Sequence, residues 1–314
     1  MSSLTVISKT PPEIQLSEIP PQGGQERLSL KVLLAFFAIY VIWGSTFLAI
    51  RTAVLLVPPW LCAGIRFFTA GVVLFAYTQL RGEQRPTLRE WRSLAILGVL
   101  MFSVTYGALF WGEQFVPSGI TSVLEATLPL FTVLLEVFVL RQQKFRWRVL
   151  VAVAVGFCGV ALMMFKKGHS SFGVVPCLVI LGGSLSWSLG AVLTRSLPLP
   201  KSRTVTAGAQ MMLGGGSLLL LSLLSGELHP FPAIPARAAF ALVYLITAGS
   251  LIGFTAFVWL LGRMPASRVS SHAYVNPVVA IALGYFLAAE EITLRTLLGA
   301  GLVLGSVVLS MRDR

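Results

Sequence analysis

From about residue 32 onward, long apolar stretches of the chain alternate with short polar links. A helix that crosses the hydrocarbon layer of a bilayer needs about 20 mostly apolar residues. Helices are the expected form, because the backbone groups of a segment in lipid must be satisfied within that segment. The pattern predicts an all-α integral membrane protein with ten transmembrane helices, at about 32–54, 59–80, 93–112, 118–140, 149–165, 174–195, 204–224, 239–261, 269–288 and 296–311.

Residues 1–31 lack this pattern, because proline and glycine are scattered there among Ser, Gln and Glu. Such a composition buries too little apolar surface to fold and predicts a disordered tail. The remaining chain divides into two groups of five predicted helices, 32–165 and 174–311.

The two groups repeat each other. Four residues of the first group recur 144 positions later, and four others recur at a spacing of 148; the pairs are Trp43/Trp187, Arg51/Arg195, Gly64/Gly208, Gly71/Gly215, Trp111/Trp259, Pro117/Pro265, Ser122/Ser270 and Pro129/Pro277. Five helices is an odd number, so the second copy must enter the membrane from the opposite side. The sequence therefore predicts two inverted five-helix repeats, an arrangement found in many secondary carriers.

Composition and charge agree with this picture. Hydrophobic residues make up 56% of the chain and charged residues only 11%, whereas a soluble domain carries about a quarter charged residues. With a cytoplasmic N-terminus, 18 of the 24 Lys and Arg residues fall in or beside cytoplasmic links and 5 in outer links. The positive-inside rule thus predicts that both termini are cytoplasmic. The net charge of +12 follows from this topology and does not indicate nucleic-acid binding.

Several motifs resemble those of the EamA family of the drug/metabolite transporter superfamily. They occur in order along residues 32–311, at Trp43–Arg51, Pro58–Pro59, Val116–Gly119, Thr127–Phe131, Ser186–Trp187, Tyr274–Pro277, Glu290 and Gly299. The resemblance implies a multi-pass carrier of the inner membrane that exports amino acids or other small metabolites. One departure is Gln142, which stands where family members often have a second Glu matching Glu290. We interpret Glu290 as a structural residue at a helix end.

Two charged residues lie inside predicted spans. Arg66 is about 10 Å deep at 1.5 Å per residue, and Glu125 lies at a similar depth from the same side. They could pair with each other, or an amino acid could place its carboxylate on Arg66 and its ammonium on Glu125. Arg66 could instead extend toward the outer surface. Glu125 belongs to a polar helical face, which predicts either a hydrated cavity or a structural polar seam; that face comprises Ser118, Thr121, Ser122, Glu125, Thr132 and Glu136.

Aromatic and polar residues near the bilayer centre complete the candidate site. Trp43 and its repeat partner Trp187 would flank a midplane site or serve in packing. The substrate-binding candidates are Tyr40, Trp43, Arg66, Tyr106, Ser122, Glu125, Trp187, Tyr274 and Asn276. The proton-coupling candidates are Glu125 and His272, although a lone His near a helix start is often a hydrogen-bonded fixture.

The sequence contains no phosphate-binding loop and no metal-ligand spacing, so we expect no ATP hydrolysis, cofactor or metal. It also lacks the clustered groups of an intramembrane enzyme. We therefore predict a secondary active transporter that works by alternating access on a small-molecule substrate. The alternatives are a gradient-driven facilitator, a drug- or sugar-type carrier, and a non-transporting membrane assembly protein. The substrate, the coupling ion and the oligomeric state stay open.

Overall fold

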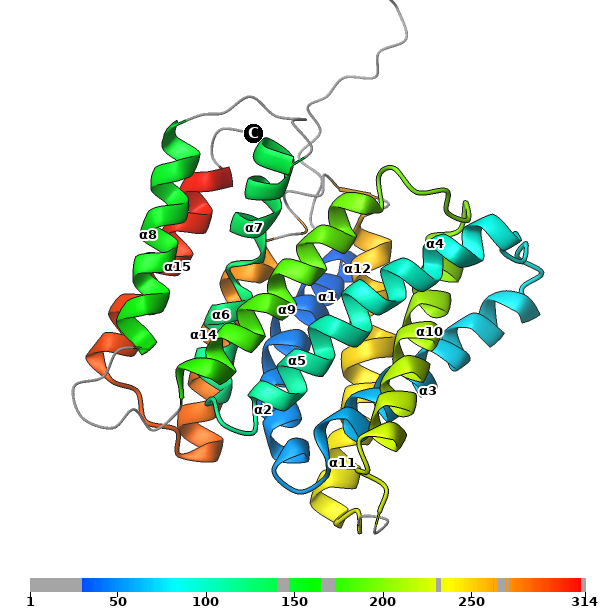
Figure 1. Cartoon of the computed structure of the whole chain (residues 1–314), viewed down its shortest axis with the longest axis horizontal. Helices are drawn as coiled ribbons and strands as arrows, with labels where there is room; N and C mark the ends of the chain where they lie inside the picture. The colour runs from blue at the N-terminus through cyan, green and yellow to red at the C-terminus, as the bar shows by residue number, and fades with distance from the viewer. Residues whose placement is uncertain are drawn as a thin grey trace, which may run out of the picture.

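The computed structural model describes residues 30–139, 147–164, 173–229, 233–261, 263–264, 269 and 271–311. Residues 1–29 of the tail expected at 1–31 lie outside them, whereas Leu30 and Lys31 begin the first helix. Every regular element in the described part is a helix (Figure 1). In chain order these are α1 (Leu30–Phe37), η2 (Ala38–Ile42), α2 (Trp43–Val54), α3 (Pro59–Leu80), α4 (Leu88–Gly98), η3 (Val99–Val104), α5 (Thr105–Gly112), α6 (Ser118–Glu125), α7 (Leu128–Leu134), η4 (Leu135–Val139), α8 (Trp147–Met164), α9 (Val174–Leu193), α10 (Arg203–Leu224), α11 (Ala236–Tyr244), η5 (Leu245–Ile252), α12 (Gly253–Leu261), α14 (His272–Ala288) and α15 (Leu294–Met311).

Seven helical segments of the described chain are long and apolar enough to cross a membrane: Leu30–Val54, Pro59–Leu80, Leu88–Gly112, Ser118–Phe138, Val174–Leu193, Arg203–Leu224 and Ala236–Leu260. Three shorter apolar helices occupy the other expected positions, at Leu150–Met163, His272–Ala288 and Leu294–Leu309. Large apolar side chains remain on the outer surface, among them Phe240 and Phe286, which are 77% and 78% exposed. Such a surface suits lipid rather than water.

Prolines and glycines set several helix ends. Pro59 begins α3, where its missing N–H costs no helical hydrogen bond. A break at Ala126 and Thr127 separates α6 from α7, as expected from Pro129 at the start of α7. At the other ends, Gly82 and Gly226 follow α3 and α10 with φ of 73° and 82°, a conformation that favours glycine. These two glycines are 144 positions apart, so the repeats end their second helices in the same way.

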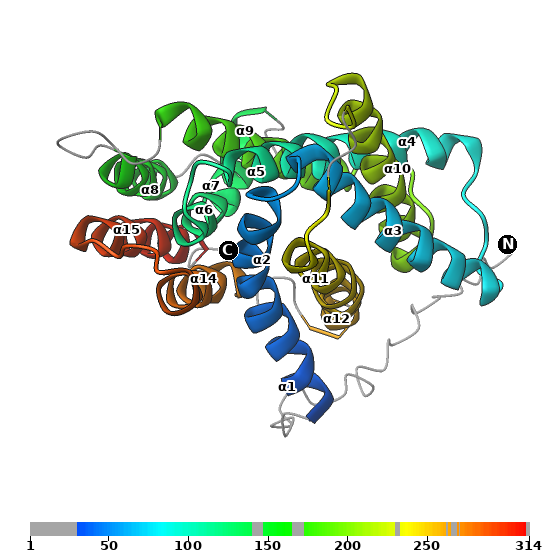
Figure 2. The same ribbon diagram turned by 90° about the horizontal axis from the view of Figure 1, so that it is seen from below.

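The repeat-related helices α3 and α10 pack closely along each other (Figures 1 and 2). A Cβ added at Gly71 would collide with the backbone of Met212, and one added at Gly215 would collide with the backbone of Phe68. Gly208 similarly faces the backbone of Phe75, 2.8 Å from its amide nitrogen. The recurring glycines therefore allow the backbones of the two helices to approach, as small residues do in membrane helix pairs.

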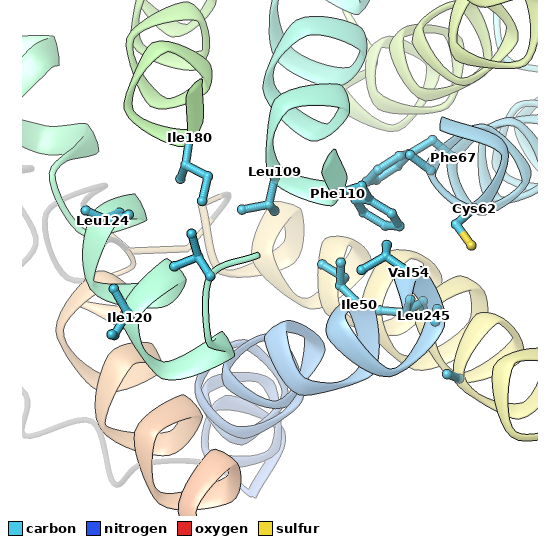
Figure 3. Packing of buried hydrophobic residues seen from close by; sticks show 14 of the residues in the cluster. Ile50, Val54, Cys62, Phe67, Leu109, Phe110, Ile120, Leu124, Ile180 and Leu245 are labelled. Carbon is cyan, nitrogen blue, oxygen red and sulfur yellow. The ribbon is translucent and has the colours of Figure 1, made fainter. Parts of the chain in front are cut away.

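One large apolar core joins the two halves of the chain. Ile50 and Val54 of α2, Phe110 of α5 and Ile180 of α9 are all buried in it. Figure 3 shows these side chains gathered between helices from both halves. Helices α8 and α15 lie side by side at one edge of the bundle, as both views show (Figures 1 and 2).

Four of the helical segments contain a π-helical stretch, in which the hydrogen bonds span one residue more than in an α-helix. Two of these stretches, η3 and η5, occupy matching places in the third segment of each repeat, because residues 99–104 correspond to 247–252 at the spacing of 148.

Candidate functional site

Arg66 lies in the middle of α3 and is almost fully buried, at 4% exposure. Its Nε donates a hydrogen bond of 3.1 Å to Oγ of Ser250. Its guanidinium carbon lies 4.6 Å from the ring centre of Phe67 and 5.5 Å from that of Tyr106. Its Nη1 has no hydrogen-bond partner among the described residues. Arg66 is thus enclosed by protein and does not extend to the surface.

Glu125 is the last residue of α6, and its side chain is half-buried. Its Oε1 accepts a hydrogen bond of 2.8 Å from Oγ of Ser184, which lies on α9 in the second half of the chain. The two embedded charges do not form an ion pair with each other, although both residues are described. Each is instead held by a serine of the second repeat.

Tyr106 of α5 is the centre of the ring contacts beside Arg66. Its ring centre lies 4.3 Å from that of Phe67 and 6.0 Å from that of Trp187, which meets it nearly edge-on at 85°. Phe102 packs against Tyr106 and Trp187 at 6.0 and 5.9 Å. We call Arg66, Phe67, Phe102, Tyr106 and Trp187 the Arg66 group.

A second group surrounds Trp43. Its Nε1 donates a hydrogen bond of 2.9 Å to the carbonyl of Gly249. Its ring centre lies 5.2 Å from that of Phe257 and 5.0 Å from that of His272, which it meets edge-on. The hydroxyls of Tyr40 and Ser271 share a hydrogen bond of 2.6 Å nearby. We call Tyr40, Trp43, Phe257, Ser271 and His272 the Trp43 group.

The wide turns of η5 connect the two groups. Gly249 accepts the hydrogen bond from Trp43, and the next residue, Ser250, accepts that from Arg66. Trp43 and Trp187 therefore belong to separate groups on either side of this stretch.

The other three predicted site residues that remain to be placed are Ser122, Tyr274 and Asn276. Ser122 is buried, and its hydroxyl donates a hydrogen bond of 2.7 Å to the carbonyl of Gly119. Tyr274 packs beside the apolar cluster of Leu130, Val153 and Val307.

Asn276, oriented so that its amide nitrogen faces acceptors, donates to the carbonyls of Ile39, Tyr40 and His272 at 3.0, 3.1 and 3.0 Å. These hydrogen bonds to Ile39 and Tyr40 connect α14 to the π-helical stretch η2.

A polar network that was not predicted from the sequence lies at one end of the bundle. Arg51 Nη1 donates to the carbonyls of Glu113 and Val116, at 2.7 Å each, and its Nε lies 3.5 Å from Oε1 of Glu290. Glu290 accepts three further hydrogen bonds from the start of α6, from the N–H and Oγ of Ser118 at 2.8 Å each and from the N–H of Gly119 at 3.1 Å. It thus caps the positive end of that helix dipole. The recurrence of Arg51 as Arg195 was the signal that could have identified this network.

The repeat counterpart of Arg51 also forms an ion pair. Arg195 Nη1 lies 2.7 Å from Oε1 of Glu136, a fully buried residue of η4. Each repeat therefore places the arginine near the end of its first span against a carboxylate.

A separate cavity of about 260 Å³ opens between α3, α5, α9 and α10. Its lining is apolar, and it contains none of the predicted site residues; the lining residues are Trp60, Ser103, Val104, Gly107, Ala108, Trp111, Val179 and Leu221. Among the described residues, no three His, Cys, Asp or Glu side chains gather as a metal site would require.

Comparison with known proteins gives consistent results. A sequence profile described as the EamA-like transporter family matches residues 30–165 and 175–312. The chain is 38% identical over 279 residues to the "Uncharacterized inner membrane transporter YedA" of Escherichia coli (strain K12), covering 88% of this chain and 89% of that protein. It is 28% identical over 285 residues to the "Probable terminal-alkyne amino-acid exporter" of Streptantibioticus cattleyicolor, covering 90% and 94%.

A solved structure described only as "Crystal structure of protein" superposes with a TM-score of 0.60 at 20% identity, covering 88% of this chain and 95% of that one. At that identity the likeness concerns the fold alone.

Proposed function

The chain belongs to the EamA-like transporter family, and we propose that it is a secondary active transporter that exports amino acids or related amphiphilic metabolites across the inner membrane. Its relatives are named as membrane transporters, and its apolar helices place it in the inner membrane as a multi-pass protein. Family and relatives point to a transporter rather than an enzyme.

We propose a topology of ten spans with both termini cytoplasmic. The charge bias of the links supports it. Residues 32–165 and 174–311 would then form two inverted repeats of five helices each, and 1–31 a cytoplasmic tail. The three shorter apolar helices would complete the ten spans, since a bilayer can thin locally around a short helix.

The observation that carries the substrate assignment is the separation of Arg66 from Glu125. Both lie inside spans of the proposed topology, and neither neutralises the other. An embedded charge without an opposite partner is costly. A zwitterion would supply both missing partners, with its carboxylate on Arg66 and its ammonium on Glu125. Tyr106 and Trp187 would offer aromatic surface to its side chain.

The two arginine–glutamate pairs support alternating access. In the proposed topology Arg51 and Glu290 lie at the outer face, whereas Arg195 and Glu136 lie at the cytoplasmic face. Opening toward the outer face would separate Arg51 from Glu290 and keep the cytoplasmic pair, and opening toward the cytoplasm would do the reverse. The inverted repeat makes the two events equivalent.

A substrate panel in proteoliposomes tests the proposal. Counterflow of a radiolabelled amino acid with a large apolar side chain should exceed that of its N-acetyl derivative and of its methyl ester, because each derivative lacks one charge. Equal transport of all three compounds would exclude zwitterion recognition. A preference for sugars or for cationic drugs would favour the drug- or sugar-type carrier.

An imposed pH gradient separates coupled transport from facilitation, since a facilitator would not respond to it. Absence of counterflow for the whole panel would favour a non-transporting role.

A further inference from the structure

Glu113 is a buried acid that the proposed substrate site does not use. It follows the last residue of α5 directly, and it is 0% exposed. Neither of its carboxylate oxygens has a hydrogen-bond partner in the part of the chain that the structure describes. Its main chain is bonded at both groups, because its N–H donates to the carbonyl of Leu109 at 2.9 Å and its carbonyl accepts from Arg51. Burying such a group in the charged form without a partner costs several kcal/mol or more.

Four charged groups on different elements act electrostatically on Glu113. Arg51 comes from α2, Arg66 from α3, Glu125 from the end of α6 and Glu290 from the segment after α14. None of them forms an ion pair with its carboxylate. The two arginines are partly offset by the two other acids, so the surroundings do not compensate a negative charge on Glu113.

Desolvation by burial raises the pKa of the Glu113 carboxyl well above its ordinary value, and Arg51 opposes this shift. The neutral acid is therefore the stable form in this conformation. A sodium ion would be a poor substitute for the proton, because it would need several oxygen ligands beside two guanidinium groups.

We propose that Glu113 is a proton-binding site of the transport cycle, which holds a proton in this conformation and releases it when Arg51 leaves the backbone carbonyls to pair with the carboxylate. This inference deepens the proposed function and rests on it. Arg51 already contacts the carbonyl of Glu113, so the change requires only local movement of its long side chain. The proton would pass from the carboxyl to water at the face where Arg51 and Glu290 lie. Breaking the contact between Arg51 and Glu290 would thus be linked to loss of the proton.

Infrared difference spectroscopy of the purified protein tests the site without any transport assay. The protein at neutral pH should show the carbonyl stretching band of a protonated carboxylic acid, shifted in deuterium oxide. The band should be lost in Glu113→Gln and remain in the matched variant Glu291→Gln, whose side chain is exposed. A Glu125→Gln sample assigns any band that arises from the substrate site. Glu113→Leu provides a second variant without polar atoms if the amide folds poorly. An unchanged band in both Glu113 variants would overturn the proposal.

Transport measurements then distinguish failure of the Glu113 proposal from failure of the proposed transport function. Glu113→Gln should keep substrate counterflow, which needs no net proton movement, and should lose stimulation by an imposed pH gradient. Suppose that the wild type transports and that Glu113→Gln still responds to the pH gradient. This result would refute the role of Glu113 in proton coupling and leave the proposed function intact. If the wild type transports nothing on the panel, the proposed function fails, and the infrared result alone decides whether Glu113 binds a proton.

Discussion

The sharpest test of the substrate site is Glu125→Gln. Gln keeps the length and the acceptor oxygen of Glu, so the hydrogen bond from Ser184, which is 2.8 Å long in the wild type, can persist. What the substitution removes is the negative charge. We therefore expect the variant to fold and reach the membrane like the wild type, and to transport zwitterionic amino acids poorly.

The structure sets the size of both effects. A hydrogen bond to a charged group contributes about 1.5–3 kcal/mol and one between neutral groups about 0.5–1.5 kcal/mol, so stability should fall by only about 1 kcal/mol. Loss of the charged partner of a substrate ammonium removes about 1.5–3 kcal/mol of binding, or roughly 10- to 150-fold in affinity. The N-acetyl derivative lacks the ammonium, so its weaker transport should not change.

The assay is counterflow in proteoliposomes, with the amino acid and its N-acetyl derivative compared on the same preparation. Glu291→Gln is the matched control, because it removes an exposed carboxylate near the end of α14. Ser184→Ala measures what the hydrogen bond alone contributes. If Glu125→Gln keeps the wild-type ratio between the two substrates, Glu125 does not recognise an ammonium group. A variant that fails to fold would instead assign Glu125 a structural role.

Three further predictions concern packing, topology and the Arg51 network. Gly215→Ala should lower the free energy of unfolding by about 1–3 kcal/mol through overpacking. The adjacent Gly216→Ala should not, because its new Cβ would meet only ring atoms of Phe68, at 3.6 Å or more. Equal thermal unfolding of the two variants would contradict the close approach of α3 and α10. In a cysteine-free background, an impermeant thiol reagent applied to intact cells should label Ser225→Cys and not Gln84→Cys, and the reverse result would invert the topology. Arg51→Gln should lower the free energy of unfolding by about 1.5–3 kcal/mol, because it removes a charged donor from two carbonyls. Denaturant titration in detergent measures this change, and unchanged stability would show that the network contributes little.

Local features of the sequence predicted much of the fold. The helix positions follow from apolar length, and the break before α7 follows from Pro129, since both depend only on neighbouring residues. Gly71 and Gly215 marked the repeat in the sequence, whereas the close packing of α3 and α10 that they allow is seen only in the structure. The predicted start of the ninth segment at 269 differs slightly from that of α14 at His272.

Partners across the fold were harder to foresee. Nothing near Glu125 in the sequence indicates Ser184, and nothing near Arg51 indicates Glu290, because these contacts depend on how distant helices pack. Glu113 was missed since a single acid at the end of an apolar segment looks like a solvated link residue. Only the three-dimensional structure shows that it is completely buried.

The π-helical stretches also show where the two repeats are alike and where they differ. η3 and η5 stand at matching places in the third segment of each repeat. By contrast, η2 and η4 correspond to regular α-helix in α9 and α14. The wide turn that links Trp43 to Arg66 is therefore common to both repeats, whereas the wide turns of the first and fourth segments have no π-helical counterpart at the matching residues of the second repeat.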